Sequence, residues 1–226
     1  MEITIRSSLV SKKIELKRFI TSLSSSCRLV LTNLENDYDV VKINNEDLFF
    51  ISNTVIDEIS KFSRYPEFGD ITDILDIIGY SHDFLDREII SLSTTDKIYL
   101  NLFRNISRSC DLILFENIFD GLDNNNQKIM VKVIKYLLDK DYNFIISSES
   151  SDILYSLSDY SIVASDDEII YSKTDEIYSD VDLLKRLNIS IPTLSYITYK
   201  AKRDKGVKLF YSKDVRDIIK DIYKHV

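Results

Sequence analysis

"LILFENIFDGLD", residues 112–123, is the stretch that decides the fold. Its run of apolar residues from Leu112 to Phe115 is typical of a strand in a sheet that is covered on both faces. An acidic turn follows at once, and buried strands that end in carboxylates often hold a metal ion or position a water. The residue that follows the strand's carboxylate is Asn117, an amide without a titratable proton at neutral pH. The stretch therefore indicates either a catalytic strand end that has lost its catalyst or an ordinary strand and turn.

The segments on both sides alternate between strand and helix patterns, which favours an α/β fold. It is a mostly parallel sheet flanked by helices, with an inserted helical subdomain and a small C-terminal helical extension. Strand patterns cover 1–5, 27–33, 38–43 and 143–147, and a hairpin covers 160–165 and 168–172. Helix patterns cover 11–23, 54–92 with a stop at Gly79, 93–106, 126–138, 180–187 and 214–225.

Composition narrows the possible functions. The net charge of −8 argues against nucleic acid as a partner, because phosphate backbones require positive potential. Two cysteines, Cys27 and Cys110, give no disulfide framework, and no signal peptide or membrane span is recognisable. We therefore expect a cytoplasmic chain, peripheral to a membrane if it acts there. Only four glycines are present, whereas average usage predicts about sixteen, so a backbone wrapped around phosphates is disfavoured.

The order of these segments resembles the ATP-binding subunits of ABC transporters, closest to the ATPase subunits of energy-coupling-factor (ECF) importers. Residues 112–123 match the Walker B strand and D-loop, with Glu116 at the magnesium-binding Asp, Asn117 at the catalytic Glu and Asp123 ending the D-loop. "LSTTD", residues 92–96, matches the L-S-G-G-Q signature and keeps Ser93. Residues 44–59 match the Q-loop region, with Asn44 at the glutamine, and residues 180–206 match the C-terminal stretch of ECF subunits.

The resemblance implies a P-loop NTPase-like fold with an α/β core at 1–53 and 110–178. The helical subdomain would cover 54–109 and the C-terminal extension 179–226. Running the family frame back to the start places residues 1–5 on the strand before the phosphate loop and Lys12 at its lysine. In that frame the family's N-terminal antiparallel strands are absent, and Glu149 falls near the switch histidine.

Every departure from the family falls on nucleotide chemistry. The phosphate loop has no glycine to form a nest of backbone N–H groups around phosphates. Thr94 and Thr95 replace the signature glycines. Asn117 removes a general base, which contributes about 10²–10⁴-fold to a rate. Glu116 remains as a weak candidate metal ligand. We therefore expect no cofactor, or ATP and Mg²⁺ if the family activity survives.

Each of these residues also has an ordinary interpretation. Lys12 can be a solvated lysine, Glu116 an ion-paired or capping carboxylate, and Glu149 a surface acid. In the helix pattern 93–106, Ser93 and Asp96 are placed like an N-cap and an acidic residue three positions later.

Three functions stay open at this point. The first is a degenerate, non-catalytic subunit that pairs with an active ATPase or with itself and docks on a membrane transport subunit. The second is a divergent but active ABC ATPase, and the third is a free-standing cytosolic regulatory protein. For the first, residues 44–68 are the expected docking region, with Phe49, Phe50 and Tyr65 as candidate contacts because aromatic residues concentrate binding energy.

Overall fold

The structure is a computed structural model of the chain. It describes residues 2–6, 11–15, 21–23, 28–30, 40–45, 48–62, 69–106, 112–206, 209 and 212–224. The chain divides into two compact units, which are described separately below. The terminal unit comprises Met1–Glu35 and Ile146–Val226, and the middle unit comprises Asn36–Ile145. The domain limits expected from the family resemblance follow a different division and stay a prediction.

The middle unit is built on parallel strands. Strand β5 (Val40–Asn44) pairs in parallel with β6 (Leu112–Glu116), so that Asn44 lies opposite Glu116. Strand β7 (Phe144–Ser147) follows β6 in the sheet and carries the chain into the terminal unit. The rings of Phe115 and Phe144 stack with their centroids 5.4 Å apart. Each of the three strands contains consecutive apolar residues, as expected for a sheet that is covered on both faces.

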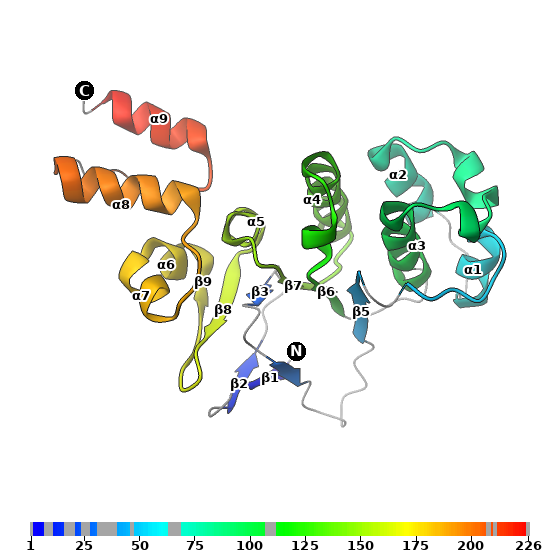
Figure 1. Cartoon of the computed structure of the whole chain (residues 1–226), viewed down its shortest axis with the longest axis horizontal. Coiled ribbons are helices and arrows are strands. Elements are labelled where there is room, and N and C mark those ends of the chain that lie inside the picture. The colour runs from blue at the N-terminus through cyan, green and yellow to red at the C-terminus, as the bar shows by residue number, and fades with distance from the viewer. Residues whose placement is uncertain are drawn as a thin grey trace. The chain divides into compact units, whose positions relative to one another are not determined.

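Helices of the middle unit lie beside these strands (Figure 1). They are α1 (Val55–Phe62), α2 (Gly69–Ile78), η1 (His82–Asp86), η2 (Ile89–Ser91), α3 (Thr94–Ile106), η3 (Ile118–Gly121) and α4 (Asn124–Asp139). Helix α2 ends where Gly79 adopts a positive φ of 77°, a conformation that favours glycine. Tyr136 of α4 donates to Asp70 and Asp73 of α2 at 2.9 and 2.7 Å, which joins the two helices.

The terminal unit contains one antiparallel sheet and one mixed set of strands. Strand β1 (Glu2–Arg6) pairs antiparallel with both β2 (Ser11–Glu15) and β4 (Arg28–Val30). Strand β3 (Thr21–Leu23) pairs in parallel with β8 (Tyr160–Ala164). Strand β8 continues antiparallel into β9 (Ile169–Lys173) through the predicted turn at Asp166 and Asp167.

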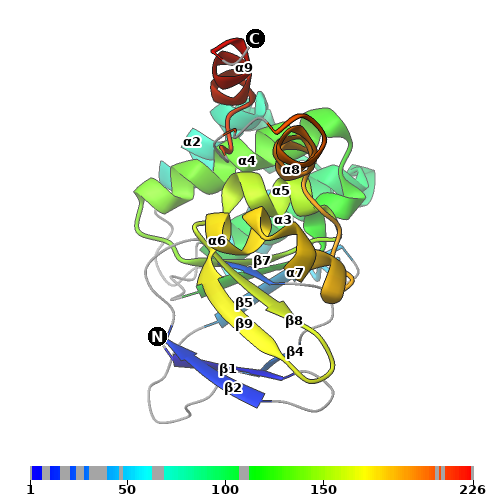
Figure 2. The same cartoon turned by 90° about the vertical axis from the view of Figure 1, so that its left-hand side faces the viewer.

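Five helices complete this unit in the residues that the structure describes. They are α5 (Ser151–Leu157), α6 (Thr174–Ser179), α7 (Val181–Arg186), α8 (Thr193–Lys205) and α9 (Val215–Tyr223). Figure 2 shows α6 and α7 at one end of the long β8–β9 hairpin. The predicted α/β fold, with parallel strands, flanking helices and a helical C-terminal region, is confirmed. Helices α5 and α6 have no counterpart among the predicted helix patterns.

Two expectations for the N-terminal region are wrong. The helix pattern at 11–23 coincides with two strands, β2 and β3, because cross-strand pairing overrides a weak helical preference. Ile14, expected on a helix face, instead lies opposite Ile3 in the antiparallel pair. The antiparallel strands expected to be absent are present as β1, β2 and β4.

Candidate functional site

The turn after β6 adopts a left-handed backbone at Asn117, whose φ is 53° and ψ is 25°. The Asn117 carbonyl accepts a hydrogen bond of 2.9 Å from Nδ2 of Asn45, which directly follows β5. The same Asn45 side chain packs against Gly121, where a Cβ atom would lie 2.5 Å from Nδ2. The Asn45 side chain therefore connects the end of β5 to the turn after β6, and Gly121 leaves space for it.

Glu116, at the expected magnesium position, forms an ion pair with Lys42 of the neighbouring strand. Both side chains are about half exposed. In the described part of the chain, no group of three or more His, Cys, Asp and Glu side chains could hold a metal ion. Glu116 is thus an ion-paired carboxylate, which is one of the ordinary interpretations that its sequence position allowed.

Helix α3 begins with a capping box that involves the residues at the signature position. Asp96 N donates to Oγ of Ser93 at 3.1 Å, while Oδ2 of Asp96 accepts from the Ser93 backbone N at 3.0 Å. The Tyr80 hydroxyl donates to the other Asp96 oxygen, and burial together with this bond raises the pKa of Tyr80. The predicted cap is confirmed, and a carboxylate of the chain itself occupies the start of this helix.

Asp123, the last D-loop residue, is the N-cap of α4. Its Oδ1 accepts from the backbone N of Asn125 at 2.9 Å and of Asn126 at 2.8 Å. The hydrogen bond from the Asn126 backbone is the main cause of the lowered pKa of this carboxyl. Its local role is to satisfy the free N–H groups of the helix start.

Lys12 lies in strand β2 and not at the start of a helix. Its Nζ donates to the Ile169 carbonyl of β9 at 3.2 Å. Strand β1 is antiparallel to both of its neighbours, so residues 1–5 are not the strand before a phosphate loop. That expectation was wrong because both described neighbours of β1 pair with it in the antiparallel direction.

Strand β3 is the strand of the described N-terminal region that pairs in parallel, as the strand before a phosphate loop does. Only residues 24–27 separate β3 from β4. The phosphate-loop motif alone needs about eight residues and is followed by a helix. The four residues between these two described strands are too few for either part.

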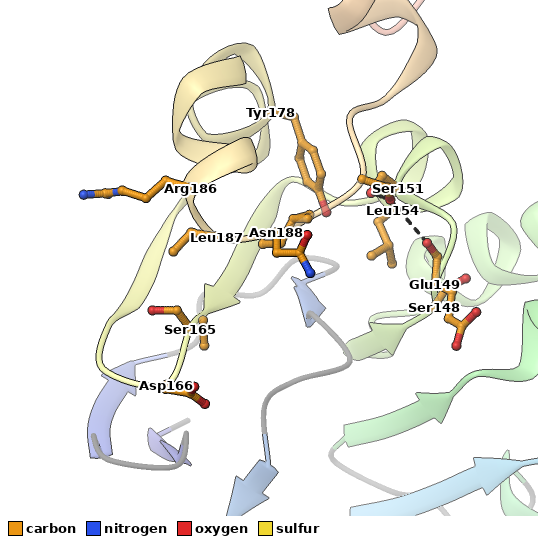
Figure 3. Close-up of a pocket in the computed structure, with 13 residues that line it drawn as sticks. Ser148, Glu149, Ser151, Leu154, Ser165, Asp166, Tyr178, Arg186, Leu187 and Asn188 are labelled. Atoms are coloured by element: carbon orange, nitrogen blue, oxygen red, sulfur yellow. Dashed lines mark hydrogen bonds between the residues drawn. The ribbon is translucent and has the colours of Figure 1, made fainter.

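Glu149 lines a pocket of about 580 Å³ in the terminal unit, beyond the end of β8 (Figure 3). Asp166 lines the same pocket. The Arg186 side chain points away from the cavity in Figure 3, and its guanidinium pairs with Glu168 at 3.1 Å. The Glu149 carbonyl accepts from the Ser190 hydroxyl at 3.5 Å.

Part of the segment expected to dock a partner lines a depression of about 510 Å³ in the middle unit, called the docking groove below after that expectation. Its lining residues are Leu48, Phe49, Phe50, Ser52, Asn53, Glu88, Ile89, Ile90 and Lys97. Phe49 is 76% exposed and Ile90 is 88% exposed, which are large fractions for apolar side chains. Backbone bonds join the two walls: Ile89 N donates to Asn53 O at 2.8 Å, and Val55 N donates to Arg87 O at 3.1 Å. The groove is thus preformed.

The structure brings some of the predicted site residues together. Asn44, Glu116 and Asn117 meet at the ends of β5 and β6, and Phe49 and Phe50 share the docking groove. Tyr65 lies outside the described residues. Sequence reasoning missed Ile90, which forms the opposite wall, because an isoleucine inside a helical pattern is more often a core residue. No helix of the described ranges is long and apolar enough to cross a membrane.

Comparison with known proteins gives distant relatives. No family model matches the chain. It is 24% identical over 154 residues to a Listeria monocytogenes protein described as an ABC transporter ATP-binding protein, covering 68% of this chain and 55% of that one. It is 24% identical over 153 residues to the energy-coupling factor transporter ATP-binding protein EcfA2 of Mycoplasma mobile, covering 67% and 49%. The chain therefore spans about half the length of the curated relatives it matches.

Among solved structures, cbiO1 of Clostridium perfringens, part of the ABC transporter complex cbiONQ, superposes with a TM-score of 0.63. The identity is 15%, and the match covers 85% of this chain and 92% of that one. The predicted resemblance to ABC-transporter ATP-binding subunits and the predicted fold are thus confirmed.

Proposed function

Because the chain has the fold of an ABC-transporter ATP-binding subunit, we propose that it is a non-catalytic subunit of this type. It pairs with an ABC-type ATPase and docks on a membrane transport component, at the inner face of the membrane. The relatives support this setting, since they are named as parts of transporters.

The observation that carries the non-catalytic half of the proposal is the connection of four residues, 24–27, between β3 and β4. A connection of this length is too short to form the nest of N–H groups that holds the phosphates of ATP. The remaining positions do not fit ATP–Mg²⁺ either. Glu116 is paired with Lys42, Asn117 cannot act as a base, and Asp96 occupies the start of α3.

The docking groove supports the second half of the proposal. Phe49 and Ile90 are exposed apolar residues that line one preformed depression. Such a surface suits the apolar face of a helix, since helical partners bind through rows of apolar side chains. We assign this occupant to the membrane transport component.

The test is purification of the tagged chain from its native cells with identification of the bound proteins. We expect a membrane transport subunit and an ABC ATPase to accompany the wild type, and Phe49→Asp to lose the membrane subunit. Tyr223→Asp is the matched control, because Tyr223 is 79% exposed and lies outside the groove. Retention of the membrane subunit by Phe49→Asp contradicts docking at this groove. Recovery of neither partner favours a free-standing regulatory protein.

A further inference from the structure

One buried ion pair lies behind the groove wall that carries Phe49 and Phe50. Glu58 of α1 is fully buried, and its Oε1 lies 3.1 Å from Nη1 of Arg104 in α3. Neither residue lines the groove. Burial of a carboxylate costs free energy unless the group is paired and hydrogen-bonded. Glu58 therefore needs contacts with the surrounding chain to stay buried.

The pair contacts each residue of the segment 49–52. Glu58 Oε2 accepts from the backbone N of Ile51 at 3.1 Å and of Ser52 at 2.9 Å. Arg104 Nη1 donates to the Phe49 carbonyl at 3.0 Å, and the guanidinium lies 5.2 Å from the centroid of the Phe50 ring.

Arg104 is itself fixed from other directions. Its Nη2 donates to Oδ1 of Asn101 at 2.8 Å, and the guanidinium lies 5.1 Å from the centroid of the Phe62 ring. The planar guanidinium offers several donors in a fixed geometry, which lysine does not. Residues 49–52 form no helix or strand, so their backbone groups lack the hydrogen bonds of regular secondary structure. The charged side chains of Glu58 and Arg104 supply hydrogen bonds to this segment instead.

We propose that Glu58 and Arg104 are positioning residues for the docking groove. They hold residues 49–52 in the conformation that presents Phe49 and Phe50, so that an arriving apolar helix need not order this wall. This inference rests on the proposed docking function, and it predicts that Arg104 governs partner affinity without touching the partner. Preformed binding surfaces gain affinity because little conformational freedom is lost on binding.

The test is residue-resolved hydrogen exchange of the backbone amides of Ile51 and Ser52. In Glu58→Gln and Arg104→Met, we expect protection at both amides to fall by about tenfold or more, because hydrogen bonds to a charged acceptor are lost or weakened. Protection of helix α2 should change less. The matched control is Lys140→Met, which removes the Lys140–Asp70 ion pair of 3.5 Å in the same unit and should leave both amides unchanged.

Arg104→Lys is the conservative variant, and it covers the case in which Arg104→Met does not fold. We expect its protection at Ile51 and Ser52 to lie between those of wild type and Glu58→Gln. Unchanged protection in Arg104→Lys and Glu58→Gln overturns the proposal, and so does a loss spread evenly over the middle unit.

The partner experiment separates this inference from the proposed function. We expect Arg104→Lys to retain less of the membrane subunit than Lys140→Met does. If the two amides respond as expected but Phe49→Asp still binds, the docking function fails while the positioning contacts stand. If Phe49→Asp abolishes binding but the amides do not respond, the positioning role fails alone.

Discussion

At the scale of single residues, the contact between Asn45 and Gly121 shows why a glycine is needed at position 121. A Cβ at position 121 would lie 2.5 Å from Nδ2 and 2.9 Å from Cγ of Asn45, and that side chain also donates to Asn117 O. The glycine therefore provides space for a side chain, and not an unusual backbone angle.

We expect Gly121→Ala to lower the free energy of unfolding by about 1–3 kcal/mol, since overpacking displaces a hydrogen-bonded neighbour. Gly69→Ala is the matched control, because nothing lies within 4 Å of a Cβ there. We expect Gly69→Ala to leave the free energy of unfolding unchanged or to raise it by a few tenths of a kcal/mol or more. Urea denaturation measures both, and equal stabilities of the two variants would contradict the packing argument.

Glu58 predicts a pH dependence at the same scale. Burial alone would raise the pKa of this carboxyl, but hydrogen bonds from Ser52, Ile51 and Arg104 lower it below the ordinary value of 4.5. A lowered pKa stabilises the folded state above pH 4.5, and this contribution is lost as the pH falls through the folded-state pKa. The difference in unfolding free energy between wild type and Glu58→Gln should therefore shrink below pH 4.5. A constant difference from pH 7 to pH 3 would contradict it.

At the scale of secondary structure, residues at the expected signature position have a structural role at the start of α3. Ser93 and Asp96 cap each other, and Tyr80 binds the remaining carboxylate oxygen. The backbone N–H groups of Ser93 and Asp96 and the Ser93 hydroxyl are therefore used by the chain itself.

Ser93→Ala should therefore cost about 1 kcal/mol of unfolding free energy, the usual loss for a serine N-cap. Ser60→Ala, the same change in the exposed middle of α1, should be neutral or slightly stabilising because alanine is the better helix former. Thermal or urea unfolding gives both values, and a neutral Ser93→Ala would show that the capping box adds nothing to stability.

Much of the element order was predictable, and the reason for the failures is physical. Strands β6 and β7 and helix α4 have strong local patterns, and the Ser93–Asp96 cap is a short-range signal. Strands β2 and β3 lack such patterns. Whether Ile14 lies in a strand is decided by its pairing with Ile3, which an eleven-residue separation along the chain hides from local reasoning. The groove's second wall, at Ile90, depends on the same kind of distant contact.

At the scale of the whole molecule, several described positions of the expected nucleotide site have structural partners within the chain. Lys12 is bonded to Ile169, Glu116 to Lys42, and the connection after β3 has four residues. The groove, in contrast, keeps exposed aromatic and aliphatic side chains on a rigid frame.

We therefore expect the isolated chain not to bind ATP–Mg²⁺ in calorimetry. Asn117→Glu, which restores a carboxylate at the base position, should produce no hydrolysis, because the phosphates still have no binding loop. A dissociation constant tighter than about 10 μM, or roughly −7 kcal/mol, would contradict the first expectation. Turnover by the variant would contradict the second.

The two walls of the groove are joined through main-chain atoms, from Ile89 N to Asn53 O and from Val55 N to Arg87 O. Substitution of a side chain leaves these atoms in place. The outline of the groove and its chemistry can therefore vary separately during evolution. Positions 49 and 90 can exchange one apolar or polar group for another, and the same depression would then accept a different helix. For protein engineering, a few substitutions on the surface of the groove can therefore change its partner specificity while the backbone keeps its shape.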